Sequence, residues 1–257
     1  MFGIDLSHHN NGSRKISAEA WKNIKAAAEF VIIRDGFGKE LFQKDKQFEN
    51  NYVGARAAGI ENIGAYHYSY ALTPEAAAKE AHVCLEILGG KQFGMPVFFD
   101  VEEPEHAKLS GAELEEIAKA FITPLEAAGY WTGFYSFDSM FCKLSEVFQR
   151  RYACWVASVS TPVRYCKHYG IWQNSWSGHI DDVAGDIDTN ICYRDYPAAI
   201  KYAGKNGYKA MASPQQKPKT KMYTVTAART GVTEEKLSDI VTSLQVQGFT
   251  VATTAEE

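Results

Sequence analysis

The stretch Pro96-Val-Phe-Phe-Asp-Val-Glu102 decides how the chain folds, because it reads as an apolar strand that ends in two carboxylic acids. A helical pattern over residues 74–88 precedes it, and an earlier strand pattern covers residues 62–70. A helix between two strands favours a parallel pair, whose strands end at the same edge of a sheet. An unpaired buried charge costs on the order of several kcal/mol. Asp100 and Glu102 therefore mark either a strand that runs out into solvent or a functional site.

The same alternation of strand and helix extends over most of the chain. Strand patterns occur at residues 2–6, 30–34, 62–70, 96–102, 131–136, 153–158, 169–174 and 184–190. Helical patterns occur at residues 17–29, 45–58, 74–88, 110–128 and 137–150. Thr73-Pro74 is a typical helix start, and Ser110 with Glu113 forms a capping-box pattern. The sequence predicts an α/β fold, a TIM-like (β/α) barrel with eight strands and five helices, irregular because its last strands leave little room for crossover helices.

The composition is that of an ordinary globular protein. Of 257 residues, 46% are hydrophobic and 23% are charged, and the net charge is −4. No basic run is present, which argues against nucleic acid and anionic membrane as partners. No apolar run reaches the roughly 20 residues of a membrane span, and the start resembles no signal peptide. We expect a protein made in the cytoplasm that acts elsewhere only after release.

The cysteines and the end of the chain give two further expectations. The five cysteines are scattered and form no C-x-x-C pair, so we expect reduced thiols in the core and neither a metal nor another cofactor. Residues 1–211 form the predicted barrel domain, and residues 212–221, with two prolines, resemble a linker. Residues 222–257 show a β-α-β pattern that is too short to bury a core alone. We expect this module to pair with a copy of itself, giving a homo-oligomer, or to dock on another partner.

The predicted strand ends bring acids together at one end of the barrel. The carboxyl ends of barrel strands carry the chemistry in this architecture, and here they bear Asp5, Asp100, Glu102, Asp186 and Asp188. Residues two apart on a strand face the same side, so Asp100 and Glu102 share one face. Repulsion among such acids raises the pKa of at least one, and a carboxyl kept protonated can donate its proton to a leaving group. Each acid alone could instead cap or begin a turn.

Aromatic residues accompany the acids on the later strands. They are Trp131, Tyr135, Trp155, Trp172 and Trp176. Tryptophans are more often core than ligand platforms, but aromatic faces beside carboxylates are typical of a sugar site. The pattern points to glycoside cleavage by a carboxylate pair.

The histidines do not change this reading. Adjacent residues on an extended segment face opposite ways, so we do not expect His8 and His9 to share one metal ion. We interpret His67 as a hydrogen-bond donor that lines the barrel.

In order along the chain, several motifs resemble the lysozymes of glycoside hydrolase family 25, also called Chalaropsis-type muramidases, which are common among phage endolysins and autolysins. They are Gly3-Ile-Asp5-Leu-Ser7, Phe30-Val-Ile-Ile-Arg-Asp-Gly36, the run from Ala58 to His67, Phe99-Asp-Val-Glu102, Trp155-Val-Ala, Ile171-Trp-Gln173 and Ile187-Asp-Thr-Asn190. The resemblance covers about residues 1–195. One departure concerns Arg34-Asp35, where the family often has Lys-Ala, so we expect that edge of the cleft to differ.

The resemblance implies a flattened, irregular barrel that hydrolyses the β-1,4 bond between N-acetylmuramic acid and N-acetylglucosamine in bacterial peptidoglycan. It implies that Glu102 is the general acid and that Asp100 orients the substrate's acetamido group, stabilises the charge at the sugar carbon or acts as nucleophile. Substrate-binding roles fall to Asp5, Asp188, Tyr66, Tyr135, Trp155 and Gln173. The alternatives are a peptidoglycan-binding protein without catalysis and a chitinase-like glycosidase. For the module at residues 222–257, the resemblance implies cell-wall binding as an alternative to dimerisation.

Overall fold

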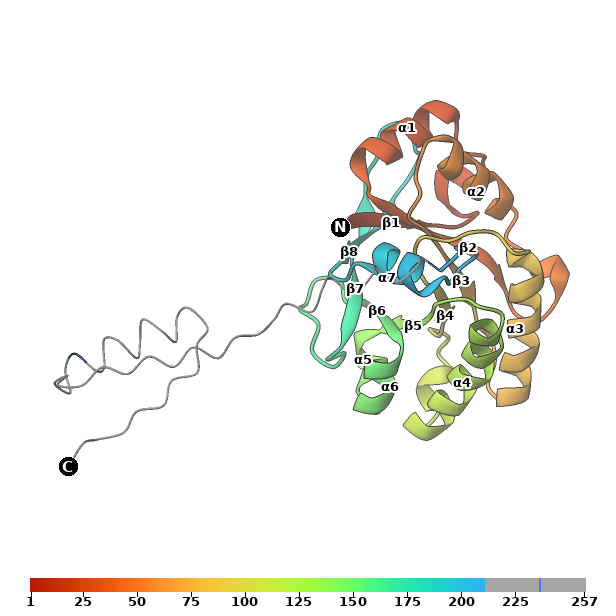
Figure 1. The fold of residues 1–257 in the computed structure, drawn as a ribbon, viewed down its shortest axis with the longest axis vertical. Coiled ribbons are helices and arrows are strands. Elements are labelled where there is room, and N and C mark those ends of the chain that lie inside the picture. The colour runs from red at the N-terminus through yellow and green to blue at the C-terminus, as the bar shows by residue number, and fades with distance from the viewer. Residues whose placement is uncertain (211–235, 237–257) are drawn as a thin grey trace. The chain divides into compact units, whose positions relative to one another are not determined.

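A computed structural model describes residues 1–210 and residue 236, and its centre is a closed barrel of eight strands (Figure 1). Each strand pairs with the next along the chain, and the last closes on the first. The predicted eight-stranded α/β barrel is confirmed. The strands are β1 (Phe2–Leu6), β2 (Phe30–Phe37), β3 (Ile63–Tyr68), β4 (Val97–Asp100), β5 (Thr132–Phe137), β6 (Ala153–Ala157), β7 (Tyr169–Gly178) and β8 (Ile187–Cys192).

The last strand runs against its neighbours. Strands β1 to β7 pair in parallel, whereas β8 is antiparallel to both β7 and β1. The simple expectation of a parallel sheet is therefore wrong for β8. The connection from β7 to β8 covers residues 179–186 without a helix, and it returns the chain from the end at which β7 finishes. Consequently the start of β8, not its end, lies beside the carboxyl end of β1, and Asp188 pairs with Asp5.

Helices surround the barrel in Figure 1. The α-helices are α1 (Ala18–Ala27), α2 (Phe48–Ala57), α3 (Pro74–Leu88), α4 (Gly111–Ala127), α5 (Asp138–Phe141), α6 (Glu146–Arg151) and α7 (Tyr196–Ala203). Short 3-10 helices occupy Asn10–Ser13, Leu41–Gln43 and His106–Lys108.

The described residues thus contain seven α-helices rather than the five expected. The fifth expected helix is divided because Ser145, with extended backbone, starts α6 by accepting a hydrogen bond from Phe148 N. The unexpected α7 starts at Asp195, whose side chain caps Ala198 N.

The core has an inner and an outer part. Inside the barrel, Phe30, Phe98 and Trp155 are buried below the rim that bears the acids. The outer part lies between the strands and the helices, where Phe99 of β4 stacks on Phe121 of α4 with ring centroids 4.3 Å apart. Four cysteines are buried as expected, but Cys142 is exposed. Among the described residues, side chains thus fill the inside of the barrel below the rim that bears the acids.

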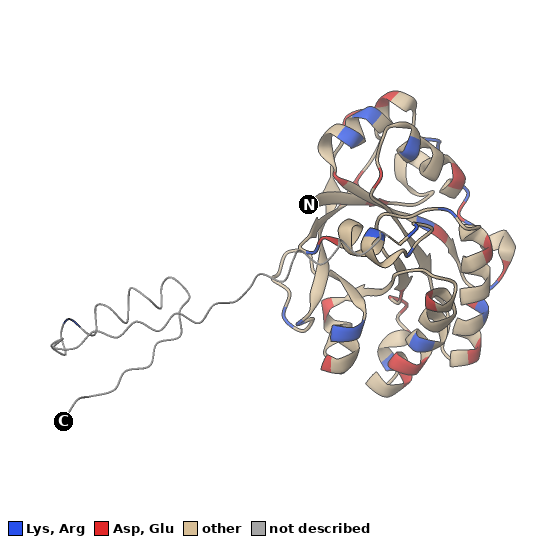
Figure 2. Ribbon diagram, in the orientation of Figure 1, with Lys and Arg blue, Asp and Glu red and all other residues tan. Residues whose placement is uncertain are grey.

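Acidic and basic residues are interspersed along the outer helices (Figure 2). Several form exposed pairs within one helix, such as Lys22 with Glu19 and Arg150 with Glu146. Such exposed pairs contribute little to stability. Within residues 1–210, no helix combines the length and apolarity that crossing a membrane requires. Apart from residue 236, the predicted linker and module at 212–257 lie outside the described residues.

Candidate active site

One cavity of about 220 Å³ opens among the strand ends that bear the acids. Ten residues line it, and eight of them are the residues that the sequence singled out. These are Asp5, Tyr66, Asp100, Glu102, Tyr135, Trp155, Gln173 and Asp188. The other two are Phe137 and Trp176, of which only Trp176 had been noted, as one of the aromatic residues near the later strands. The chain therefore brings together four carboxyl groups and an aromatic wall around one cavity. We call this cavity the acid cavity.

Asp100 and Glu102 form the side of the acid cavity that β4 supplies. Asp100 is the last residue of β4, is 2% exposed, and has an Oδ1 with no hydrogen-bond partner in the described part of the chain. Burial, followed by repulsion from Glu102 and Asp5, raises the pKa of Asp100 well above its usual value. Burial and repulsion from Asp188 raise the pKa of Glu102 to about 7. Both carboxyls therefore hold protons at a pH where an exposed acid has lost its own.

Asp5 and Asp188 face this pair from the opposite strands. Asp5 Oδ2 accepts hydrogen bonds from Asn190 Nδ2 at 2.8 Å and from Gln173 Nε2 at 2.9 Å. Burial and repulsion from Asp188 raise the pKa of Asp5 to about 7, although these two hydrogen bonds act to lower it. Burial and the nearby Asp186 raise the pKa of Asp188 to about 6. The antiparallel β8 is what brings Asp188 to this rim.

Gln173 holds the two sides of the acid cavity together. Its Nε2 donates to Asp5 and, at 3.3 Å, to Asp188 Oδ2. Its Oε1 accepts from the Tyr135 hydroxyl at 2.8 Å and from Trp176 Nε1 at 3.1 Å. Because Gln173 is 1% exposed, these four contacts fix both carboxylates and both aromatic side chains in place.

The aromatic wall is a packed cluster centred on Trp155. Its ring lies 4.3 Å from that of Tyr135 and 5.9 Å from that of Tyr66, measured between centroids. Its Nε1 donates to Asn190 Oδ1 at 2.8 Å. Asn190 thereby orients both Trp155 and Asp5, a role that the sequence did not assign, although the motif Ile187-Asp-Thr-Asn190 contains it.

Two of the aromatic residues noted in the sequence lie elsewhere. Trp131 lines a separate cavity with Thr132 and Lys205. The indole of Trp172 donates to the Ser158 carbonyl oxygen at 2.9 Å, and its ring packs against the outer core. Trp172 follows the inward-facing Ile171 and therefore faces outward. Trp131 packs against the inner core like Tyr135, but it precedes β5 and so lies at the end of that strand opposite the acids.

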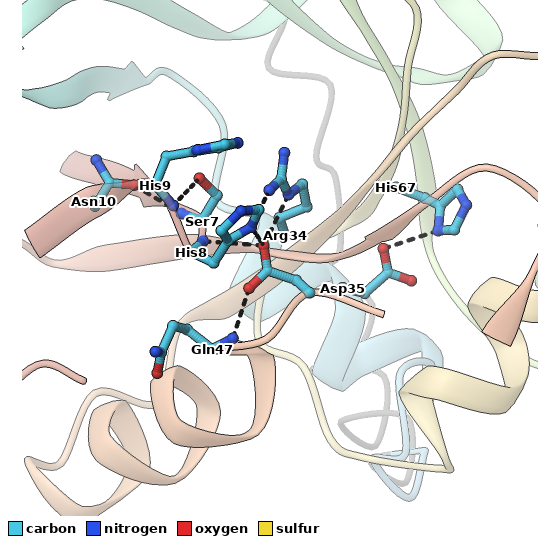
Figure 3. Close-up of polar contacts among 9 residues, drawn as sticks. Ser7, His8, His9, Asn10, Arg34, Asp35, Gln47 and His67 are labelled. Atoms are coloured by element: carbon cyan, nitrogen blue, oxygen red, sulfur yellow. Dashed lines mark hydrogen bonds and ion pairs between the residues drawn. The ribbon is translucent and has the colours of Figure 1, made fainter. Parts of the chain in front are cut away.

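His67 was expected to line the inside of the barrel, but it lies on the outer side of the sheet. Its ring lies 5.6 Å from that of Phe121 in α4, so it faces the helices. One ring nitrogen contacts Asp35 Oδ1 at 3.0 Å (Figure 3), and the other contacts the Gly38 carbonyl oxygen at 2.8 Å. Burial acts to lower the pKa of His67, but the two acceptors outweigh it and raise that pKa. Cys84 adds a third group, with all ligand atoms within 4.8 Å of one another. A buried ion pair between His67 and Asp35 explains this cluster.

Comparisons with known proteins agree with this geometry. Residues 4–183 match the family described as Glycosyl hydrolases family 25. No curated protein sequence matches the chain.

Solved structures share the fold at low sequence identity. The bacterial lysozyme from Streptomyces coelicolor is 24% identical with a TM-score of 0.63, and the match covers 80% of this chain and 97% of that one. The family 25 glycosyl hydrolase from Bacillus anthracis is 19% identical with a TM-score of 0.63, covering 79% and 93%. The modular autolysin LytC from Streptococcus pneumoniae is 22% identical with a TM-score of 0.62, and the match spans 74% of this chain but only 46% of LytC.

Proposed function

Because the chain belongs to family 25 of the glycosyl hydrolases, we propose that it is a peptidoglycan hydrolase. In this proposal it cleaves the β-1,4 bond between N-acetylmuramic acid and N-acetylglucosamine and acts on the bacterial cell wall. The observation that carries the proposal is the convergence of Asp5, Asp100, Glu102 and Asp188 on one cavity with an aromatic wall. A related autolysin, LytC, has been solved with a synthetic peptidoglycan ligand, which supports this class of substrate.

Glu102 is the residue that we assign as general acid. A pKa of about 7 keeps a large share of it protonated near neutral pH, so that it can protonate the glycosidic oxygen as the bond breaks. It is also less buried than Asp100, so a glycosidic oxygen can approach it from the cavity. No such supply of protons is available from a carboxyl with an ordinary pKa.

Asp100 lies on the same side of the cavity, and we assign it to the charge that develops at the sugar carbon. It stabilises that charge directly or orients the acetamido group of the substrate, which then attacks the carbon itself; substrate assistance of this kind is a known variant of glycoside hydrolysis. Asp5 and Asp188 complete the acidic floor, and Tyr66, Tyr135, Trp155 and Gln173 bind the sugar.

A protein that only binds peptidoglycan would use the same cleft without cleaving it. Such a protein has no need of four clustered carboxyls, whose burial and mutual repulsion cost stability. A chitinase-like glycosidase shares the D-x-E arrangement but is not favoured by the family match.

Product analysis tests the proposal. Purified protein and its Glu102→Gln variant are incubated with peptidoglycan, and the new reducing ends are identified. We expect muramic acid ends from the native protein and a rate about 100 to 10,000 times lower from the variant. Glucosamine ends, or undiminished activity in the variant, would contradict the assignment.

A further inference from the structure

A second cavity adjoins the acid cavity. Its volume is about 510 Å³, and it shares Tyr66, Asp100 and Glu102 with the acid cavity. A polymer that passes over the shared carboxyls therefore occupies both cavities at once. The two cavities differ in chemistry, because the second has a basic edge formed by His8, His9 and Arg34. We call the second cavity the basic cavity.

Arg34 is held in a fixed position at this edge. Its Nε donates to Asp45 Oδ2 at 2.9 Å, and its Nη2 lies 2.5 Å from His8 Nδ1 (Figure 3). Asp45 is itself fixed, because it also accepts from the backbone N–H groups of His8 and Gln47. Arg34 is 8% exposed, so its position does not depend on a mobile surface side chain.

The buried ion pair next to Arg34 adds to this rigidity. Asp35 follows Arg34 in β2, and its carboxylate pairs with His67 behind the sheet. The segment that carries Arg34 is therefore anchored on both of its faces. A preorganised guanidinium loses less entropy when it binds a ligand.

The guanidinium retains bonding capacity on the cavity side. Within residues 1–210, Nη1 has no hydrogen-bond partner, and the group lies 5.7 Å from the ring centroid of Phe37, which also lines the basic cavity. Arginine presents its donors in a planar fork that matches the two oxygens of a carboxylate. The aromatic rings of Tyr68 and Tyr70, 5.3 Å apart, supply a wall on which a sugar can pack.

The two cavities differ in the charged groups that line them. No Lys, Arg or His is among the described residues that line the acid cavity, whereas Arg34, His8 and His9 line the basic cavity. The pKa of His9 is lowered by partial burial and then by the neighbouring His8 and Arg34, whereas Asp45 acts in the opposite direction. Of the two cavities, only the second offers an anionic substituent of the substrate a cationic partner among the described residues, namely Arg34.

We propose that Arg34, held by Asp45 and His8, binds a carboxylate carried by the muramic acid sugar of the substrate. The carboxylate belongs either to the lactyl group of a sugar without its peptide or to the stem peptide attached to that group. N-acetylglucosamine has no such group, so this contact orients the glycan in the cleft. The inference rests on the proposed function, because it assumes that the cleft takes peptidoglycan.

Binding measurements with matched glycans test this role. The Glu102→Gln full-length chain, which is slow to cleave, is titrated with glycan strands whose carboxyl groups are free or converted to methylamides. We expect about tenfold tighter binding of the free carboxylates, the contribution of one charge-assisted hydrogen bond. Adding Arg34→Met should bring this ratio close to one, while Arg56→Met, at an exposed position of α2, should leave it unchanged.

A second variant distinguishes loss of binding from loss of folding. Arg34→Met leaves the buried Asp45 without its partner, which can destabilise the fold. The double variant Arg34→Met with Asp45→Asn removes both charges, and the amide oxygen of the introduced asparagine can still accept a backbone N–H. We expect the ratio of the affinities for free and methylamidated glycans to fall close to one in this variant as well. Circular dichroism checks that the variant is folded. A ratio that stays near tenfold in either folded variant overturns the proposal.

Two substrate arms identify the carboxylate. In peptide-free strands the free group is the lactyl carboxylate, and in peptide-bearing strands it belongs to the stem peptide. Loss of selectivity in either arm supports the proposal, and loss in neither refutes it. Failure of the proposed function is seen separately, as the absence of new reducing ends with the native protein.

Discussion

Glu102 and Asp100 lie on one face but differ in how solvent reaches them. Asp100 is 2% exposed at the end of β4, whereas Glu102 lies two residues beyond it and is half-buried. Burial is the largest cause of the raised pKa in both, and for Glu102 the next is repulsion from Asp188. A single residue on another strand therefore helps to set the pH at which Glu102 can donate a proton.

Replacing Asp188 with Asn tests this coupling. Without the charge of Asp188, the ionised form of Glu102 is less disfavoured, so the pKa of Glu102 falls and its proton is lost at lower pH. We expect the alkaline limb of the kcat/KM profile on glycan strands to move to lower pH. The control Asp181→Asn removes an exposed acid and should not move the limb. An alkaline limb that stays in place or moves to higher pH would contradict the coupling.

At the scale of elements, local signals were reliable and long-range geometry was not. Ser110 and Glu113 form the predicted capping box at the start of α4, and Thr73 caps α3 as expected. The direction of β8 could not be read, because it depends on where β7 ends in space rather than on the pattern of residues 187–192.

The same contrast applies to the site. Alternation along β4 placed Asp100 and Glu102 on one face, and the resemblance to family 25 supplied the other six candidates; all eight line one cavity. Arg34 also follows this alternation, on the inward side with Phe30 and Ile32, but its fixed position depends on Asp45 in a later segment. The bonding partners of a side chain from distant segments are not encoded in a local pattern.

The cap of α4 offers a test at this scale. Ser110 Oγ accepts a hydrogen bond from Glu113 N at 3.3 Å, and Ser110→Ala removes that acceptor. We expect the free energy of unfolding to fall by about 1 kcal/mol, as measured by urea denaturation. Ser139→Ala, at an exposed position of α5, should change it by less than about 0.5 kcal/mol. Equal stabilities of the two variants would show that the cap does not matter.

Considered as a whole, the barrel acts as a rigid and partly dry base for its carboxyls. Phe30, Phe98 and Trp155 fill the interior below the acid cavity, so water reaches the acids only from the open side. Removal of water on one side is what raises the pKa values, since low dielectric disfavours the charged form. Burying four carboxyls that repel one another lowers the stability of the fold, which a rim with a purely structural role would not require.

The predicted module at residues 222–257 bears on the oligomeric state of the full chain. Because that segment is too short to bury a core alone, we expect it to pair with a second copy. Light scattering should then give a dimer for the full chain and a monomer for a chain shortened to residues 1–211. An unchanged oligomeric state after shortening would remove this role from the module.

The most direct test of the central claim is the titration of Glu102 itself. Carboxyl carbons of glutamate are labelled with carbon-13, and the Glu102 resonance is assigned as the one missing from the Glu102→Gln variant. We predict a midpoint near pH 7, compared with 4.5 for an ordinary glutamate, because burial and Asp188 hold the proton on. A midpoint near 4.5 would contradict the account, since Glu102 would then have no proton to donate at neutral pH.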